Sequence, residues 1–322
     1  MSWADLKVLL AGCGSVGRRH ARILSSLGVS HLKICDPIAA QREALSRETP
    51  VEEIYSDYHE ALKSGPDIVF VLTPPPLHVQ MSVKALRAGC HVFCEKPLAD
   101  DMNNIQTLVE TIEQSGKKFM VGFCFRYHEG LRRAKQYLDS GRIGRLVSIR
   151  SVMGEHLPTV RPDYRTLTAS QHLGVFDLVH EIDLAVWFSG GETKTVKSIH
   201  GKISDLDIQV TDVAEVLIEF DNNCYASVHL DFFQRPRRRL TELIGTEGVI
   251  EVEFAGWNQC TVSTFTAENG VWTRETLPTE RDDMFRNEDR DFLTAVVEDL
   301  PVSIPVGEGI KSLRIVALAR RQ

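Results

Sequence analysis

The hydrophobic positions of this chain follow two patterns, and the change between them falls near residue 124. In the earlier part, short continuous apolar runs alternate with stretches whose apolar residues recur at helical spacing. The run Asp67–Leu72 is rich in β-branched residues and apolar on both faces, as in a strand buried inside a parallel sheet. Strands are predicted at Lys7–Ala11, Leu32–Cys35, Glu53–Tyr55, Asp67–Leu72, His91–Cys94 and Phe119–Phe123, and helices at Val16–Leu27, Ala39–Arg47, Tyr58–Leu62, Leu77–Ala88 and Met102–Ser115. This alternation predicts a doubly wound parallel sheet of the Rossmann type.

Beyond residue 124, apolar and polar residues alternate one by one along several segments. Such segments lie at Val213–Phe220, Cys224–Phe233, Leu240–Ile244 and Val249–Phe254, and a further strand is predicted at Leu146–Val152. Helices are predicted at Leu131–Leu138, within Gln171–Phe188, at Glu288–Glu298 and at Gly309–Arg320. This pattern predicts a mainly antiparallel sheet with helices on one face and a more open second face. We therefore expect an α/β chain of two domains, a Rossmann domain at 1–123 and an α+β domain at 124–322.

Composition narrows the class of protein. The chain has 322 residues, of which 43% are hydrophobic and 25% charged, as in ordinary water-soluble proteins. The net charge of −7 argues against nonspecific binding of nucleic acid. No apolar run approaches the roughly 18 residues that a membrane span needs. The first strand begins soon after Met1–Asp5, which leaves no room for a signal peptide, so we expect a cytoplasmic protein.

The seven cysteines are odd in number and lie mostly in apolar segments. This predicts free, buried thiols in a reducing compartment. The sequence Cys90–Cys94 contains a histidine between two cysteines, but it reads as a strand and no second ligand pair follows at zinc spacing. We therefore expect no metal site.

A glycine-rich turn follows the first predicted strand. Gly12, Gly14 and Gly17 fill the pattern G-x-G-x-x-G, and Ser15 and Val16 open the next helix. In a Rossmann domain the first glycine permits a tight turn, the second lets a pyrophosphate approach the backbone, and the third lets helix and strand pack closely. The start of the helix offers N–H groups and a positive dipole end to phosphates. These five residues are the predicted phosphate-binding residues of a dinucleotide site.

The second predicted strand ends in Asp36, about 20 residues beyond the glycines, where an acid that binds ribose is expected. A carboxylate there accepts hydrogen bonds from the ribose 2′-hydroxyl and repels a 2′-phosphate. NAD is thus favoured over NADP. Three nearby arginines, Arg18, Arg19 and Arg42, could tolerate a 2′-phosphate, which leaves NADP as the less favoured alternative.

Polar residues follow two of the buried strands at the edge where open α/β sheets bind ligands. Thr73 and Pro74 end one strand and His78 lies just beyond, which suits a loop that covers a cofactor and a histidine that positions it. Glu95 and Lys96 end the next strand, and a lysine there can donate a hydrogen bond to a substrate oxygen. The alternative for Lys96 is an ordinary solvated surface lysine.

A second chemical cluster lies in the sequence Asp177–Asp183. If this stretch is helical, Asp177, His180 and Glu181 share one face. A histidine beside a carboxylate can take a proton near neutral pH. The alternative is a histidine with a structural role, which is common on helices.

Several of these motifs together resemble the glucose–fructose oxidoreductase / inositol dehydrogenase / MocA family. The matching segments, in chain order, are Gly12–His20, Thr73–His78, Glu95–Pro97, Gly122–Arg126, Gly141–Gly144 and Asp177–Asp183. The resemblance implies that Lys96, Asp177 and His180 act at the substrate, and that Thr73, Pro74, His78, Glu95 and Lys96 contact the cofactor. This chain has Asp177-x-x-His180, one residue shorter than the common D-x-x-x-H of the family.

The resemblance also implies substrate-binding residues in the second domain. These are Arg126, Asp163, Tyr164 and Arg165, for the last three of which an ordinary polar loop is the alternative. The basic run Arg235–Arg239 suits a solvated or subunit-contact surface, or else a contact to a phosphate or nucleotide sugar.

The sequence therefore predicts an NAD-dependent dehydrogenase that acts on a carbinol of a sugar, polyol or nucleotide sugar. We expect the carbinol to lie between the nicotinamide and the second-domain sheet, with His180 taking the hydroxyl proton and Lys96 bonding the oxygen. The open sheet face predicts a homodimer or homotetramer. Alternatives are an eliminase or epimerase that recycles NAD through a keto sugar, and a non-catalytic regulator that senses the dinucleotide.

Overall fold

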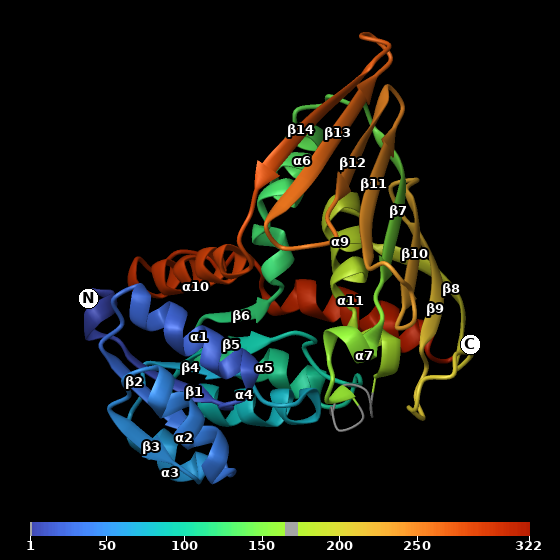
Figure 1. Cartoon of the computed structure of the whole chain (residues 1–322). Helices are drawn as coiled ribbons and strands as arrows, with labels where there is room; N and C mark the ends of the chain where they lie inside the picture. Colours follow the sequence, from blue (N-terminus) through green and yellow to red (C-terminus); the bar gives the residue numbers. More distant parts are fainter. Residues whose placement is uncertain (1, 165–172) are drawn as a thin grey trace. The chain divides into compact units, whose positions relative to one another are not determined.

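The computed structural model describes residues 2–164 and 173–322 (Figure 1). The chain divides into two compact units, one made of Met1–Cys124 with Phe285–Ile310 and the other of Phe125–Met284 with Lys311–Gln322. The sequence suggested a second domain that runs without interruption over 124–322. Residues 285–310 instead belong to the first unit, because Phe285 packs against His20 of α1 and Phe292 packs against Phe70 of β4.

The first unit is built on a six-stranded sheet in the order β3-β2-β1-β4-β5-β6. All of its pairings are parallel. The strands are β1 (Lys7–Ala11), β2 (His31–Cys35), β3 (Glu53–Tyr55), β4 (Ile68–Val71), β5 (His91–Glu95) and β6 (Phe119–Gly122). Every residue of β4 and β6 is buried, as the continuous apolar runs predict. The order reverses between β1 and β4, which makes the carboxyl ends of these two strands the switch point where open α/β sheets bind ligands.

The helices of this unit follow the predicted alternation. They are α1 (Ser15–Ser26), α2 (Ala39–Glu48), α3 (Tyr58–Lys63), α4 (His78–Arg87) and α5 (Ile105–Ser115), with the short 3-10 turns η1 (Trp3–Asp5), η2 (Pro75–Leu77) and η3 (Cys124–Tyr127). Helix α5 begins three residues later than predicted, because Asn104 before it adopts a left-handed conformation with φ of 58°. Helix α10 (Arg281–Val297) begins earlier than predicted, and α11 is Val306–Ala319.

Two glycines allow β1, the turn and α1 to close tightly. Gly12 has φ of +109°, and a Cβ atom there would lie 2.5 Å from the carbonyl oxygen of Leu72, just after β4. A Cβ atom on Gly17 would lie 2.0 Å from the carbonyl oxygen of Gly12. No residue that carries a Cβ atom fits these contacts without displacing backbone. Gly14 is different, because a Cβ atom on it would meet nothing within 4 Å.

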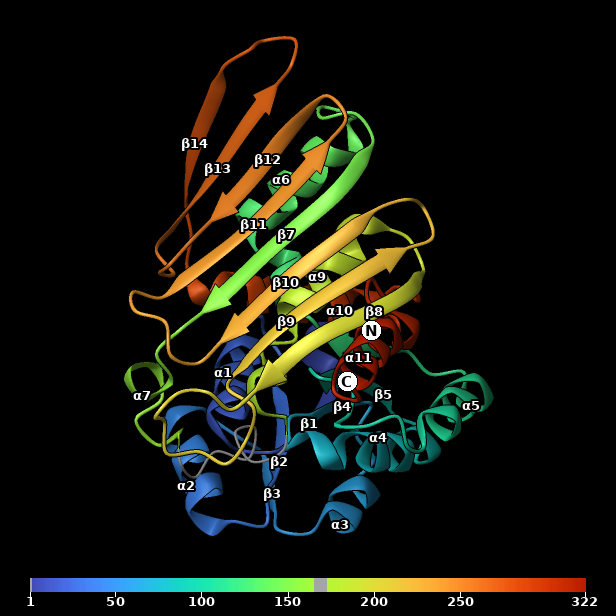
Figure 2. The same cartoon turned by 90° about the vertical axis from the view of Figure 1, so that its right-hand side faces the viewer.

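The second unit is built on an eight-stranded sheet in the order β14-β13-β12-β11-β7-β10-β9-β8 (Figure 2). Its strands are β7 (Leu146–Gly154), β8 (Thr193–Gly201), β9 (Val213–Phe220), β10 (Tyr225–Asp231), β11 (Arg238–Gly245), β12 (Gly248–Glu253), β13 (Gln259–Thr266) and β14 (Trp272–Pro278). Only β7 and β10 pair in parallel, so the sheet is mainly antiparallel. The two sheets confirm the predicted fold class, although the sequence reasoning did not single out β8, β13 and β14.

Two buried ion pairs hold helix α9 (His180–Ser189) in the second unit. The Arg126 guanidinium donates from Nε and Nη2 to the two carboxylate oxygens of Asp183, at 2.9 and 2.7 Å. Asp183 is fully buried and also accepts a hydrogen bond from the Ser312 hydroxyl at 3.3 Å. The second pair joins Arg239 Nε to Glu181 at 2.7 Å. Among the described residues, this unit also contains α6 (Glu129–Asp139), α7 (Leu157–Val160), η5 (Gly174–Asp177) and the larger part of α11.

All seven cysteines are buried and carry free thiols, as predicted. Within the part of the chain that the structure describes, no helix combines the length and apolar character needed to cross a bilayer. Over residues 2–164 and 173–322, no three His, Cys, Asp or Glu side chains are placed to share a metal ion.

We predict that Arg126→Met destabilises the second unit by about 3–5 kcal/mol, because it leaves the buried Asp183 carboxylate without its bidentate partner. The matched control is Arg150→Met, which removes the exposed ion pair with Glu242 and costs at most about 1 kcal/mol. Urea unfolding followed by tryptophan fluorescence measures both, because Trp187, Trp257 and Trp272 lie in the second unit. Equal urea midpoints for the two variants would contradict a stabilising role for the buried pair of Arg126 and Asp183.

Candidate functional site

The glycine turn places the start of α1 at the switch point of the first sheet. Gly14 is the residue before the helix, with an extended backbone at φ of −65°, and Ser15 beyond it is exposed. The first N–H groups of any helix have no acceptor inside that helix, and they carry the positive end of its dipole. Because the side of Gly14 is open, this turn can admit a phosphate group against its backbone.

Asp36, at the end of β2, lies beside this turn. Its Oδ2 accepts a hydrogen bond from the Cys13 N–H at 2.8 Å, and its Oδ1 accepts one from the Ile38 N–H at 2.8 Å. The carboxylate is half-buried and keeps lone pairs for a further donor, such as a ribose hydroxyl. The geometry fits the predicted acid of a dinucleotide site.

The three arginines that could accept a 2′-phosphate have partners inside the protein. Arg42 donates to the backbone carbonyl of Asp36 at 2.6 Å. Arg18 donates to the Gln41 side chain at 3.1 Å and lies 3.4 Å from Glu48. The Arg19 guanidinium lies 4.7 Å from the centre of the Phe285 ring. These contacts agree with a site in which Asp36, and not an arginine, faces the ribose.

His78 joins the two loops that follow β4 and β5. Its ring is buried, with Nε2 at 2.7 Å from the Thr73 carbonyl oxygen and Nδ1 at 2.8 Å from the Pro97 carbonyl oxygen. Burial lowers the pKa of His78, so the neutral ring donates one N–H to one of these carbonyls. This agrees with the positioning role expected from the sequence. Pro74, after Thr73, is exposed at the same edge.

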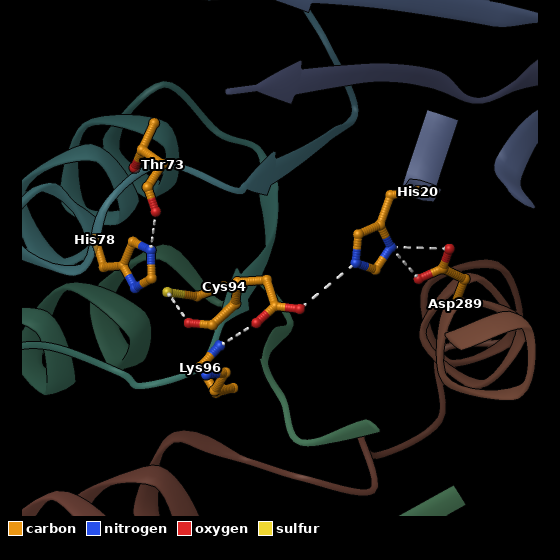
Figure 3. A network of polar contacts seen from close by, with 7 residues as sticks. His20, Thr73, His78, Cys94, Lys96 and Asp289 are labelled. Carbon is orange, nitrogen blue, oxygen red and sulfur yellow. Dashed lines mark hydrogen bonds and ion pairs between the residues drawn. The ribbon is translucent and has the colours of Figure 1, made fainter. Parts of the chain in front are cut away.

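Glu95 is the last residue of β5, and Lys96, labelled in Figure 3, follows it. Glu95 is buried, and its Oε2 accepts a hydrogen bond from the Lys96 backbone N–H at 2.8 Å. Lys96 is half-buried, and its peptide bond to Pro97 is cis. Lys96 is therefore not a fully solvated surface lysine. Its backbone is fixed by the preceding carboxylate.

His180, in the second unit, is the first residue of α9 and is half-buried. Its ring stacks on Phe125, with centroids 4.2 Å apart and an interplanar angle of 21°. The Arg239 guanidinium lies 4.2 Å from the centre of the same Phe125 ring and pairs with the buried Glu181. Phe125, Glu181 and Arg239 thus hold the imidazole and its helix, and the sequence reasoning assigned no such role to Phe125 or Arg239.

The helical face expected for Asp177, His180 and Glu181 is absent, and that prediction was wrong. Asp177 is the last residue of the 3-10 turn η5, and α9 begins only at His180. Gly174 has φ of +56°, and a Cβ atom there would lie 2.4 Å from the carbonyl oxygen of Thr211. Leu178, which follows Asp177, has ψ of 39°, outside the helical range, so η5 ends before α9 begins.

The remaining predicted substrate residues differ in their surroundings. Arg126 is buried and engaged with Asp183, so its described contacts are structural. Tyr164 is buried, whereas Asp163 is exposed. Arg165 lies outside the described residues. A substrate role for these four stays a prediction.

The basic run Arg235–Arg239 divides into two inward-facing arginines, Arg237 and Arg239, and two exposed ones, Arg235 and Arg238. Arg237 donates to Glu155 at 3.0 Å and lies 4.9 Å from the Trp257 ring centre. Arg239 is buried against Glu181. Arg235 contacts His156. The contacts of these arginines give no support to a dedicated phosphate site.

Two family models match this chain. Residues 6–123 match the model described as "Oxidoreductase family, NAD-binding Rossmann fold", and residues 131–251 match the model "GFO/IDH/MocA C-terminal domain". Together these matches span more than half of the chain.

Individual relatives support the same family. The protein named inositol 2-dehydrogenase of Salmonella typhimurium is 31% identical over 220 residues, which is 66% of this chain and 63% of the relative. The protein named scyllo-inositol 2-dehydrogenase (NAD(+)) of Bacillus subtilis is 28% identical over 76% of this chain and 73% of the relative. The match thus spans less than two thirds of the Salmonella protein's length.

The crystal structure of myo-inositol 2-dehydrogenase from Lactobacillus plantarum superposes with a TM-score of 0.83 and 25% identity, over 98% of this chain and 96% of that one. The family matches cover both sheets and the motifs at the ends of β1, β4 and β5. The chain therefore belongs to the GFO/IDH/MocA family of oxidoreductases.

Proposed function

We propose that this protein is an NAD-dependent dehydrogenase that oxidises a secondary carbinol of a cyclic polyol or sugar, with inositols as the first substrates to test. The observation that carries the proposal is the open glycine turn at the start of α1 with the Asp36 carboxylate beside it. The substrate class is supported by relatives named inositol 2-dehydrogenase, from Salmonella typhimurium and, for scyllo-inositol, from Bacillus subtilis.

The residues present fit a dinucleotide. N–H groups of Ser15 and Val16 would bind the pyrophosphate, and Asp36 would accept hydrogen bonds from the adenosine ribose. Gly12 and Gly17 keep the turn closed, while Thr73, Pro74 and His78 form the adjacent loop. NADP remains the less favoured cofactor. When bound, the nicotinamide supplies the hydride acceptor.

We assign the chemistry at the substrate to Lys96 and His180. The Lys96 ammonium donates a hydrogen bond to the carbinol oxygen and stabilises the negative charge that develops there. The His180 imidazole accepts the hydroxyl proton, as a general base. Asp177 hydrogen-bonds a neighbouring substrate hydroxyl or His180, and Glu95 orients Lys96 through its backbone N–H.

We also propose a homo-oligomer formed through the open face of the eight-stranded sheet. Ile199, Leu217 and Tyr225 share this face by strand register, and they are 81%, 58% and 58% exposed. Exposed apolar side chains on one sheet face favour burial against a second copy. The seven free thiols support a cytoplasmic location.

Substitutions in the glycine turn separate folding from cofactor binding. Gly14→Ala is expected to leave the melting temperature unchanged, because its Cβ atom meets nothing within 4 Å and its backbone suits alanine. The same methyl group takes up space where the pyrophosphate approaches, so the affinity for NAD should fall by about 10-fold or more. Gly17→Ala, the matched control, is expected to cost about 1–3 kcal/mol of stability through its clash with Gly12. Calorimetric titration with NAD and thermal unfolding measure both effects. Unchanged NAD affinity in Gly14→Ala would refute the phosphate site.

Removing either proposed catalytic side chain is expected to abolish most turnover. Lys96→Ala and His180→Ala should each lower kcat with an inositol by about 10²–10⁴-fold, while the dissociation constant for NAD changes little. Lys63→Ala, which removes an exposed lysine of α3, is the control and should keep full activity. NADH formation at 340 nm gives the rates. Wild-type turnover in either alanine variant at the proposed site would remove that residue from the mechanism.

A further inference from the structure

A buried charge network in the first unit connects α1, α10 and the end of β5 (Figure 3). His20 lies on α1, five residues after the helix begins, and is fully buried. Its Nδ1 lies 2.8 and 3.1 Å from the two carboxylate oxygens of Asp289 on α10, which is also fully buried. Its Nε2 lies 3.7 Å from Oε1 of Glu95. The other oxygen of Glu95, Oε2, accepts the Lys96 N–H.

The surroundings of this network are aromatic. The His20 ring lies 5.6 Å from Phe70, 5.3 Å from Phe93 and 5.7 Å from Phe285, measured between ring centroids. An apolar side chain would pack among these rings without any cost of burying charge. Buried ion pairs are often replaceable by apolar residues with no loss of stability. The need to fold therefore does not account for a histidine and a carboxylate at this place.

The charges of the network favour a protonated His20 ring. Burial by itself would lower the pKa of His20, but Asp289 and Glu95 outweigh it and raise that pKa to about 9. Burial raises the pKa of Asp289, and the charge of His20 opposes this effect. The imidazolium thus stands between two carboxylates at neutral pH. The pKa of the buried Cys124 thiol responds to Glu95 and Lys96, and also to Glu288 and Arg19. Glu288 and Arg19 are therefore further charged groups in this region of the first unit.

We propose that His20, fixed by Asp289, is a positioning residue that holds the Glu95 carboxylate and thereby sets the orientation and charge environment of Lys96. This role rests on the function proposed above for Lys96. It adds His20 and Asp289 to the proposed site as residues that do not contact the substrate. Without the imidazolium, Glu95 loses its cationic partner inside the protein, and Lys96 becomes the cation that balances it. The ammonium form of Lys96 is then stabilised.

The test uses His20→Gln in the full-length chain, with Lys96 observed directly. Pulse acetylation of the protein without cofactor, between pH 7 and pH 11, gives the titration midpoint of Lys96 by peptide mass spectrometry. In His20→Gln this midpoint should move up by about half a pH unit or more, so that labelling at a pH below the midpoint slows about threefold. In turnover assays with an inositol, kcat should fall about 10-fold or more while KM for NAD holds.

Two further variants complete the design. His91→Gln is the control, because His91 lies at the other end of β5 and accepts the Lys118 N–H at 3.0 Å. It should leave the Lys96 midpoint and kcat unchanged. Asp289→Asn keeps the imidazole but removes the carboxylate that holds the pKa of His20 up against burial. The ring then becomes neutral, Glu95 again loses its cationic partner, and the Lys96 midpoint should move in the same direction as in His20→Gln. This variant also serves if His20→Gln does not fold.

The outcomes separate the two proposals. A shifted Lys96 midpoint in a chain that oxidises no polyol supports the positioning role and refutes the proposed function. A wild-type midpoint in both His20→Gln and Asp289→Asn overturns the positioning role, whether or not the wild-type chain is active.

Discussion

The absence of side chains at Gly12 and Gly17 is the constraint on which the rest of the site depends. Gly12 passes within contact distance of the backbone after β4, and Gly17 passes within contact distance of Gly12. Only this close approach brings the first turn of α1 over the end of β1 with its N–H groups exposed. Asp36 then fastens the same turn from the neighbouring strand through the Cys13 N–H. The proposed phosphate and ribose sites and the helix that carries His20 all follow from one tight turn.

Buried charge is the second theme of the molecule, and each unit uses it next to a proposed catalytic residue. In the first unit, His20, Asp289 and Glu95 lead to the backbone of Lys96. In the second, Arg239 pairs with Glu181 and lies against the Phe125 ring on which His180 stacks. Ion pairs of this kind add little net stability, but removing one partner is costly. They suit a protein that must hold reactive side chains in fixed orientations.

The sequence was sufficient for features that depend on local chemistry. Continuous apolar runs predicted the parallel strands, and alternating runs predicted β9 over the residues it occupies, Val213–Phe220. The glycine turn and the acid at position 36 are close in the chain, so spacing alone could bring them together. The single motif G-x-G-x-x-G was informative because a buried strand and a helix flank it.

Features that depend on distant residues were not predictable in this way. Nothing near His20 indicates that its partner is Asp289, which is 269 positions away. The assignment of residues 285–310 to the first unit also depends on distant residues, since Phe285 meets the His20 ring of α1 and Phe292 meets rings of β4 and β5. The break between Asp177 and α9 comes from the non-helical backbone of Leu178, with ψ of 39°, which the spacing of polar residues does not reveal.

The most direct test of this account is a crystal structure of the chain with NAD bound. The account predicts pyrophosphate oxygens within hydrogen-bond distance of the N–H groups at the start of α1, and a ribose hydroxyl on the Asp36 carboxylate. A dinucleotide bound elsewhere, or one whose ribose faces away from Asp36, would contradict it.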